Sequence, residues 1–251
     1  MAYFNFENRK VYYKVEGYGA PLLLLHGNTV SSKMFSQIIK RYSRYFQVIL
    51  LDFPGHGKSE RLMKFETDFW YYNAKVTYAL INELKLDKVS VIGTSGGALV
   101  AINFALEHPE RIKYLVADSF EGEYPLQSYI NTLEKDRRRD KKKILAILIW
   151  CYCHGFGWEK IVDFDTKMNI EFSKTGKSFF HKSISELSVP TLLTGSLKDE
   201  YCDHLDIIYG KLQEKNNKLK IHLFDKGNHP AMISNKDEFL YLIKEEIDNA
   251  L

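Results

Sequence analysis

A short motif between residues 89 and 112 constrains the fold more than any other part of the chain. The run Val89–Ile92 is apolar and rich in β-branched residues, as in a buried strand, and it leads directly into Gly93-Thr94-Ser95-Gly96-Gly97. An apolar helix is predicted to follow, from Ala98 to about Glu107. A G-x-S-x-G sequence in a sharp strand-to-helix turn lifts its serine hydroxyl clear of the sheet. The context therefore predicts a reactive Ser95 and not merely a serine in a turn.

The glycines around Ser95 have a mechanical role in this turn. Gly93 and Gly97 carry no side chain, so the strand and the helix can close together around the serine, whose backbone is forced into a strained conformation. The first N–H groups of the following helix, including that of Gly96, have no partner inside the helix and point into the same space. The turn is thus expected to supply both a hydroxyl and a donor for negative charge.

Strands and helices alternate along most of the chain. Continuous apolar runs predict strands that are covered on both faces, which is typical of a parallel sheet between two layers of helices. Segments 3–6 and 10–16 instead alternate apolar and polar residues, which predicts an antiparallel hairpin at the edge of the sheet. The expected parallel strands are 21–25, 46–51, 89–92, 111–117, 191–195 and 219–224, and the expected helices include 31–44, 68–84, 203–215 and 236–249.

One long segment interrupts this alternation. No buried strand is predicted between residues 120 and 187, and the segment is helical in character. We therefore expect a core domain of residues 1–119 and 188–251, with residues 120–187 inserted as a helical cap. The fold class is α/β, a mostly parallel doubly wound sheet with a helical cap insertion.

The cap contains aromatic residues that are candidates for the wall of a substrate pocket. Trp150, Phe156 and Trp158 either pack the cap onto the core or line a pocket beneath it, and both roles can hold at once. Cys151-x-Cys153-His154 lies in the same apolar stretch without a second cluster of metal ligands. We interpret it as core packing, and we expect neither a metal nor a cofactor.

Candidate catalytic side chains follow several of the predicted strands. In a parallel sheet covered by helices, chemistry lies beyond the carboxyl ends of the strands. The four candidates that lie at such ends are Asn28, Ser95, Asp199 and His229. Glu200 and Asp203 are close to Asp199 in the sequence, and Asp118 also ends a strand, so the identity of the acid stays open on this reasoning alone.

These motifs together resemble the α/β-hydrolase fold family, and the resemblance covers essentially the whole chain. His26-Gly27-Asn28 resembles the oxyanion loop of the family, residues 52–59 resemble its D-x-P-G-x-G-x-S loop, and residues 93–97 resemble its nucleophile elbow. Asp199 and His229 match its acid and base positions, and the helical insertion matches its cap. The resemblance implies a serine hydrolase with a Ser-Asp-His triad.

The chemistry of these residue types gives each a role. A serine hydroxyl is a weak nucleophile until a base takes its proton, and neutral His229 would be that base. Asp199 would hold the imidazole in the required tautomer and stabilise its charged form. The backbone N–H groups of Asn28 and Gly96 would receive the oxyanion. Asp52, His26 and His56 are interpreted as structural.

The expected reaction is cleavage of a small or medium carboxylic ester through an acyl-serine intermediate. Amide or peptide hydrolysis, as in proline iminopeptidases, thioester cleavage and carbon–carbon bond hydrolysis remain alternatives. A peptidase of that kind would need cap carboxylates to hold a substrate amine, and Glu121, Glu123 and Glu134 are candidates. From another class, a non-catalytic small-molecule-binding protein on the same scaffold also remains, although the complete triad disfavours it.

Composition narrows the partners and the compartment. A net charge of +3 is too small to indicate a nucleic-acid partner, and the apolar stretch 144–153 is too short to span a bilayer. Three cysteines form no disulfide framework and suit a reducing compartment, and no signal peptide is visible at the N-terminus. We therefore expect a cytoplasmic protein with a small-molecule substrate, without nucleic-acid or membrane partners. The oligomeric state is not indicated.

Overall fold

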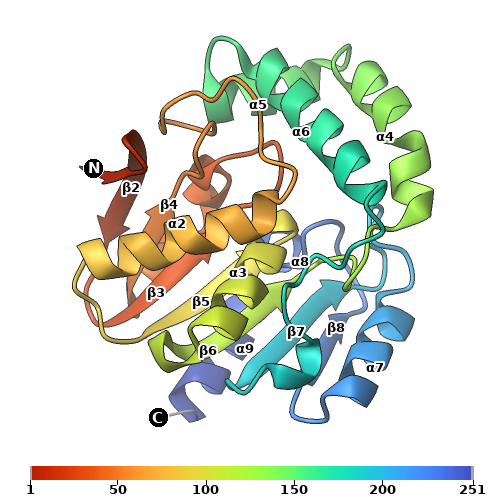
Figure 1. Ribbon diagram of the computed structural model, residues 1–251. Coiled ribbons are helices and arrows are strands. Elements are labelled where there is room, and N and C mark those ends of the chain that lie inside the picture. Colours follow the sequence, from red (N-terminus) through yellow and green to blue (C-terminus); the bar gives the residue numbers. More distant parts are fainter. Residues whose placement is uncertain (1, 250–251) are drawn as a thin grey trace.

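The computed structural model describes residues 2–249, so residues 1, 250 and 251 of the expected core domain lie outside the described residues. Eight strands form one sheet through the centre of the molecule (Figure 1), in the order β1-β2-β4-β3-β5-β6-β7-β8. The strands are β1 (Ala2–Phe6), β2 (Arg9–Glu16), β3 (Ala20–Leu25), β4 (Phe46–Leu51), β5 (Val89–Thr94), β6 (Ile112–Asp118), β7 (Thr191–Ser196) and β8 (Lys220–Phe224).

The six strands from β4 to β8 in this order run parallel, and β1 and β2 form an antiparallel hairpin that pairs with β4 at the edge. The prediction of a mostly parallel sheet with an edge hairpin is confirmed. In β3, the run Leu22–Leu25 is fully buried because its side chains alternate between two separate hydrophobic clusters, one on each face of the sheet.

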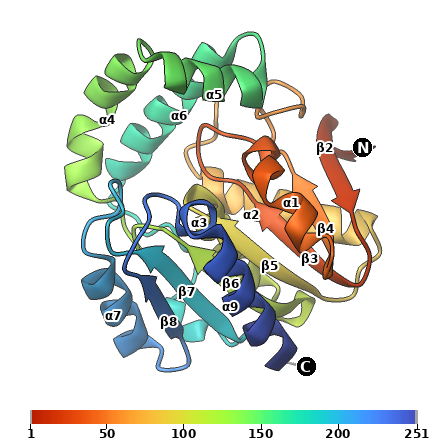
Figure 2. The same cartoon turned by 180° about the vertical axis from the view of Figure 1, so that it is seen from behind.

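Helices cover both faces of the sheet. Helices α2, α3 and α7 lie on the face seen in Figure 1, and α1, α8 and α9 lie on the opposite face, seen in Figure 2. These helices are α1 (Ile39–Tyr42), α2 (Phe69–Glu83), α3 (Gly96–Glu107), α7 (Leu205–Lys215), α8 (Ala231–Ser234) and α9 (Lys236–Asn249). Residues 2–249 contain no helix that is both long and apolar enough to cross a membrane.

The prediction of one continuous helix over residues 31–44 is wrong. The segment instead forms a 3₁₀ helix, Ser32–Gln37, followed by the single turn of α1. The Ser31 side chain accepts a hydrogen bond from the N–H of Lys33 and caps the first turn, as expected for a serine at this position. The tighter 3₁₀ winding aligns residues three apart, and it buries Phe35 and Ile38 together against the sheet.

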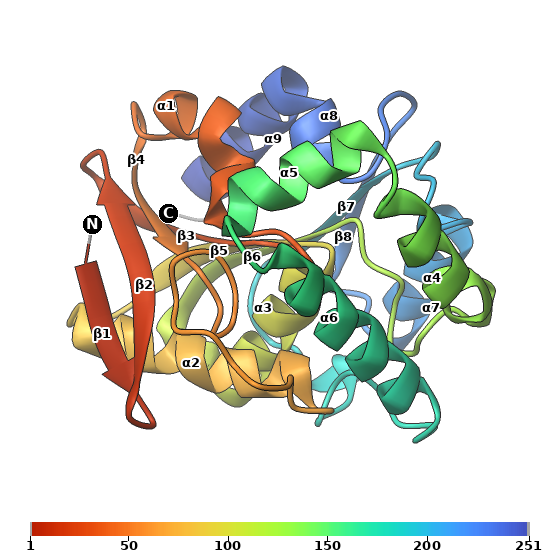
Figure 3. The ribbon, with the colours of Figure 1, turned by 90° about the horizontal axis from the view of Figure 1, so that it is seen from above.

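Three further helices lie between β6 and β7 in the chain and extend over one end of the sheet (Figures 1 and 3). They are α4 (Gln127–Asp140), α5 (Ile144–His154) and α6 (Trp158–Ser173). We call residues 120–187 the cap. Its return segment is anchored by Phe172 and Phe179, which pack edge-on against Trp70 of α2 at ring-centroid distances of 5.0 and 4.5 Å.

Candidate active site

Ser95 occupies the turn between β5 and α3. Its backbone has φ 55° and ψ −130°, a conformation that residues with a side chain rarely adopt. The turn is held by a 2.8 Å hydrogen bond from the Ser95 N–H to the Asp118 carbonyl. A side chain at Gly93 would lie 2.1 Å from the carbonyl oxygen of Gly97, so the strand and helix approach too closely for any other residue there.

Asn28 and Gly96 lie against each other beside Ser95. A side chain at Gly96 would overlap the Asn28 amide oxygen, at 1.8 Å, so this glycine makes room for the loop after β3. Within residues 2–249, neither the Asn28 nor the Gly96 backbone N–H has an acceptor. Both residues line the same cavity as Ser95. This arrangement provides donors for negative charge next to the serine.

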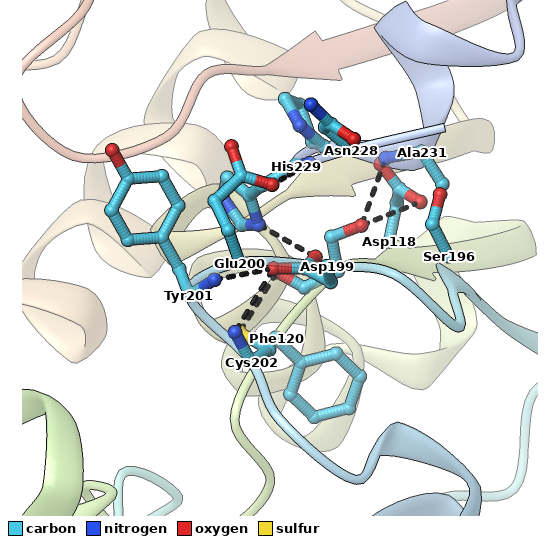
Figure 4. Close-up of polar contacts among 12 residues, drawn as sticks. Asp118, Phe120, Ser196, Asp199, Glu200, Tyr201, Cys202, Asn228, His229 and Ala231 are labelled. Carbon is cyan, nitrogen blue, oxygen red and sulfur yellow. Dashed lines mark hydrogen bonds and ion pairs between the residues drawn. The ribbon is translucent and has the colours of Figure 1, made fainter. Parts of the chain in front are cut away.

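His229 and Asp199 are joined directly. The His229 Nδ1 lies 2.8 Å from the Asp199 Oδ2 (Figure 4). The other carboxylate oxygen of Asp199 accepts hydrogen bonds from the N–H groups of Tyr201 and Cys202, both at 2.9 Å. Because Asp199 is bonded on both oxygens, its orientation toward the imidazole is fixed.

The two side chains shift each other's pKa in opposite directions. Burial lowers the pKa of His229, but the hydrogen bond and the negative charge of Asp199 outweigh it and raise the pKa above its ordinary value. Burial raises the pKa of Asp199, but its bonds to His229 and the two backbone N–H groups outweigh it and lower the pKa. The pair therefore favours an ionised Asp199 beside an imidazole that readily accepts a proton.

Asp118, the alternative acid, is engaged elsewhere. It is fully buried at the end of β6, and its carboxylate accepts hydrogen bonds from the Thr94 and Thr194 hydroxyls at 2.8 and 2.9 Å. It also accepts the N–H of Met232 at 3.1 Å. Burial raises the pKa of Asp118 to about 6. Asp118 thus ties β5 and β7 to the segment that follows His229, a role that the sequence did not indicate.

Glu200 is a second residue, after Asp118, whose role the sequence did not indicate. Its carboxylate accepts a 2.8 Å hydrogen bond from the backbone N–H of His229 (Figure 4). The Tyr201 ring stands edge-on to the His229 ring at a centroid distance of 5.2 Å. The loop that follows β7 therefore contacts His229 in three ways. Asp199 bonds its imidazole, Glu200 bonds its backbone N–H, and the Tyr201 ring packs against its ring. Such contacts join residues about thirty positions apart, and no local pattern reveals them.

A cavity of about 360 Å³ lies between the core and the cap. Ser95 and His229 line it, while Asp199 lies behind His229 and outside the lining. Trp150 of α5 lines it as well, together with polar and charged residues of the cap. The cap residues with polar side chains in the lining are Glu121, Tyr129, Arg137, Asp140 and Asn169.

The three aromatic candidates of the cap have different positions. Trp150 is buried and faces the cavity. Trp158 is also buried but lies outside the lining, stacked on Trp150 at a centroid distance of 5.0 Å. Phe156 is fully exposed, so the expectation that it lines the pocket is wrong. It lies between Gly155 and Gly157, both at positive φ, in the turn that joins α5 to α6.

Buried polar groups behind the cap side of the cavity are incompletely bonded. Arg137 donates to the Thr29 hydroxyl at 3.4 Å and to the Tyr129 hydroxyl at 3.3 Å, and its guanidinium lies 3.5 Å from the Asp165 carboxylate. The buried Nε of Arg137 has no hydrogen-bond partner, and neither does either oxygen of Asp165. Burial raises the pKa of Asp165 to about 6 despite the neighbouring guanidinium.

Of the three cap glutamates that the sequence singled out, Glu121 lines the cavity. Within the described residues, its carboxylate has no hydrogen bond or ion pair to another residue, and burial raises its pKa to about 7. The other two glutamates that the sequence singled out face away from the cavity. Glu123 pairs with Lys215, and Glu134 pairs with Arg138.

The cysteine-histidine segment of α5 attaches the cap to the core. The His154 Nδ1 accepts the N–H of Gly57 at 3.1 Å, and its Nε2 lies 2.9 Å from the Thr29 carbonyl. Burial lowers the pKa of His154 to about 4, so the ring is neutral and donates from Nε2. Both ring nitrogens are therefore occupied, and Cys151 is exposed on the other side of the helix.

The other group of possible metal ligands lies at the candidate active site. Among residues 2–249, one group with metal-ligating atoms close together is formed by Asp199, Cys202 and His229. Burial and the surrounding carboxylates raise the pKa of Cys202 well above its ordinary value, so it remains a thiol. The Asp199 oxygens are already bonded to His229 and to two backbone N–H groups. The geometry therefore suits an acid–base pair.

Known proteins are similar to this chain in sequence and in architecture. A family model described as alpha/beta hydrolase fold matches residues 20–148. Pimeloyl-[acyl-carrier protein] methyl ester esterase of Legionella pneumophila (strain Corby) is 25% identical, over 92% of this chain and 96% of that protein. (E)-2-((N-methylformamido)methylene)succinate hydrolase of Acinetobacter baylyi is 33% identical over a shorter region, 42% of this chain and 40% of that protein.

Solved structures show the same fold at low sequence identity. A variant of the meta-cleavage product hydrolase from Pseudomonas fluorescens IP01 superposes with a TM-score of 0.77 at 21% identity, covering 97% of this chain and 96% of that chain. An esterase from Exiguobacterium antarcticum superposes with a TM-score of 0.74 at 17% identity, covering 96% of each chain. The family match, the fold and the relatives agree: the chain belongs to the α/β-hydrolase fold family and is a hydrolase.

Proposed function

We propose that the protein hydrolyses small or medium carboxylic esters through an acyl-serine intermediate. The observation that carries this proposal is the 2.8 Å hydrogen bond between His229 and Asp199, in a cavity whose wall also contains Ser95. A relative that is similar over nearly the whole chain is named a methyl ester esterase. Ester cleavage is the reaction that best fits both facts.

The proposed mechanism uses these residues in two half-reactions. His229 takes the proton of the Ser95 hydroxyl as Ser95 attacks the ester carbonyl, and Asp199 stabilises the imidazolium that forms. The N–H groups of Asn28 and Gly96 stabilise the oxyanion, each donor contributing roughly 3–4 kcal/mol in the transition state. The imidazolium then protonates the departing alkoxide, and a water molecule activated by His229 releases the acid from Ser95.

The size of the cavity limits the substrate. At about 360 Å³ it lies near the lower end of ligand pockets, which span roughly 300–1,000 Å³. Leu99, Trp150 and Met34 give it an apolar part that suits a short acyl or aryl group. We expect p-nitrophenyl acetate or butyrate to be hydrolysed with a far higher kcat/KM than the palmitate. A preference for palmitate would contradict the proposed size limit.

A panel of substrates tests the bond type. The purified protein would be assayed with matched ester, thioester, amide and diketone substrates, with Ser95→Ala as the control for background hydrolysis. Turnover of esters above the other classes is expected. Clear amide or diketone cleavage without ester turnover would overturn the proposal, as would the absence of all turnover and of labelling by a fluorophosphonate probe.

A second candidate, hydrolysis of substrates that carry an amine, is favoured by one observation. Glu121 presents to the cavity a carboxylate that has no partner in another described residue, and Glu200 also lines the cavity. Asp140 lines it as well but is paired with Arg139 and Lys143. The one guanidinium in the lining, Arg137, already lies beside Asp165. The balance of charge therefore disfavours an anionic group and favours an ammonium group. Higher kcat/KM for an amino-acyl ester than for its uncharged isostere, lost in Glu121→Gln, would support this candidate.

A further inference from the structure

Helix α5 is apolar on all sides, but only one side is covered. Trp150, Cys153 and His154 are buried toward the core and the cavity. The opposite side exposes large apolar side chains, with exposed fractions of 76% for Ile144, 71% for Leu145 and 60% for Leu148. We call the whole exposed set the α5 patch; its members are Ile144, Leu145, Leu148, Ile149, Tyr152 and Phe156.

The α5 patch differs from the ordinary surface of a helix in a globular protein. A helix that packs one side on a core normally carries charged residues on the other side, whereas residues 144–156 contain no Asp, Glu, Lys or Arg. Single exposed apolar residues are common, but a contiguous set of this kind marks an interaction surface. Figures 1 and 2 both place α5 in the cap, at the end of the molecule beyond the sheet.

Lysines surround the α5 patch. Lys142 and Lys143 precede the helix, and Lys160 follows Phe156. The Lys33 ammonium lies 4.9 Å from the centre of the Tyr152 ring. Lys143 pairs with Asp140 and Glu159 is close in sequence, but among the described residues the side chains of Lys142 and Lys160 have no carboxylate partner. An apolar centre with a basic margin matches a surface that is apolar inside and anionic outside.

The patch is also continuous with the cavity. Ile149 belongs to both, since it is partly exposed and lines the cavity, and its neighbours Ala146 and Trp150 line the cavity as well. Helix α5 therefore contributes apolar side chains both to the exposed patch and to the wall of the cavity that contains Ser95.

We propose that the α5 patch docks the protein on the surface of an anionic membrane. In this arrangement α5 lies in the interface, its apolar side chains enter the boundary between head groups and acyl chains, and the flanking lysines contact lipid phosphates. The expectation of no membrane partner was drawn from the length of the apolar stretch, which concerns crossing a bilayer and not lying on it.

The charges disfavour the alternative that a second copy covers the patch. In a two-fold contact between α5 patches, the lysines at either end of one helix meet lysines of the other helix in both possible directions. An acidic carrier protein would satisfy the lysines but would have to supply an apolar surface as well. The membrane satisfies both requirements without a matching shape, so it is the occupant that the observations favour.

Vesicle co-sedimentation with the full-length protein tests the proposal. The vesicles would consist of phosphatidylcholine alone, or of phosphatidylcholine with roughly one third phosphatidylglycerol. We expect binding to the anionic vesicles that weakens as salt is raised, because exposed charges are screened. The double variant L145Q/L148Q should bind at least about tenfold more weakly, since two large apolar side chains no longer enter the lipid.

A matched control separates the patch from general effects. Ile207 is also exposed, on α7, which Figures 1 and 2 place at the opposite end of the molecule from α5, so I207Q should bind vesicles as the wild type does. L145Q/L148Q should hydrolyse a water-soluble ester at the wild-type rate, because neither residue lines the cavity. This result shows that the variant is folded, and it is independent of whether the natural substrate is an ester.

Four outcomes would overturn the proposal. One is the absence of binding to either kind of vesicle. Another is binding that L145Q/L148Q and I207Q change equally. A third is a dimer, seen by analytical ultracentrifugation, that L145Q/L148Q dissociates while no vesicle binding is detected, since the patch would then be an interface between copies. The fourth is capture of an acidic carrier protein without vesicle binding.

Discussion

The polar groups behind the core side and the cap side of the cavity wall differ in how completely they are hydrogen-bonded. On the core side, Asp199 and Asp118 each accept three or more hydrogen bonds from fixed donors. On the cap side, Arg137 and Asp165 leave buried polar atoms without partners. A fully bonded network fixes its side chains in one geometry, whereas the partly bonded pair behind the cap side is less firmly fixed. We infer that the core side of the site is the more rigid of the two.

The largest expected effect comes from removing the hydroxyl on the core side. Ser95→Ala should lower kcat by about 10⁴ or more while the protein remains folded, because the change deletes only the nucleophile. Steady-state kinetics and a thermal melt would measure both properties. A variant that kept a tenth of the wild-type turnover would show that Ser95 is not the nucleophile.

Substitution of Asp199 should lower the rate of catalysis, whereas substitution of Asp118 should lower the stability of the fold. Asp199→Asn should lower kcat by up to about 10⁴, because its amide oxygen would stay on the Tyr201 and Cys202 N–H groups and its NH₂ would face His229 and impose the wrong tautomer. Asp118→Asn should instead cost about 1–3 kcal/mol of stability, since one donor would face other donors. If Asp118→Asn were inactive and Asp199→Asn nearly normal, the acid would be Asp118.

The cap pair can be tested by a double-mutant cycle. Arg137→Gln should destabilise the protein by about 3 kcal/mol, because it leaves Asp165 buried without a counter-charge, and Asp165→Asn in the same chain should recover much of the loss. The penalty of Arg137→Gln should grow as pH rises. The pKa of Asp165 is already raised to about 6, so the folded state holds this proton more tightly than the unfolded chain and loses stability as pH rises through that value. Urea unfolding near pH 5 and near pH 8 measures both effects, and additive single effects would contradict the coupling.

The pH dependence of activity tests the electrostatics of the core side. His229 must be neutral to act as base, and Asp199 raises its pKa above the ordinary 6.5. The acid limb of kcat/KM should therefore have its midpoint above that pH. In Asp199→Asn the residual activity should show a midpoint shifted to lower pH, because the negative charge is gone. An unchanged midpoint would mean that another group controls the limb.

The smallest effect on activity is expected from substituting a cap residue that lines the cavity. Trp150→Ala should shift the acyl-length preference by several-fold toward longer chains, because it enlarges the apolar part of the cavity without touching the triad. Phe156→Ala is the matched control, since Phe156 is fully exposed, and it should leave kcat/KM for soluble esters unchanged. Equal shifts in both variants would show that the cap acts as a whole and not through its lining.

The sequence-based predictions succeeded for features that depend on neighbouring residues and failed for those that depend on residues far apart in the chain. The buried strands and the Ser95 turn are encoded by adjacent residues, so the apolar runs and the glycine spacing predicted them. The 3₁₀ helix at Ser32–Gln37 depends on how Phe35 and Ile38 meet the sheet, and the roles of Asp118 and Glu200 depend on residues far away in the chain. The aromatic content of the cap could not distinguish Trp150 from Phe156. Whether either side chain is buried depends on how α5 packs on the core, which the local sequence does not reveal.

The backbone of Ser95 has a consequence for any attempt to evolve this protein for heat resistance. At φ 55° and ψ −130° a β-carbon is strained, so alanine at this position keeps the strain and glycine releases it. Ser95→Gly should therefore melt at a higher temperature than Ser95→Ala, by an amount that reflects about 1–3 kcal/mol. Selection for thermal survival alone would favour the glycine and discard the hydroxyl. Screens for robustness should therefore retain a demand for turnover in every round.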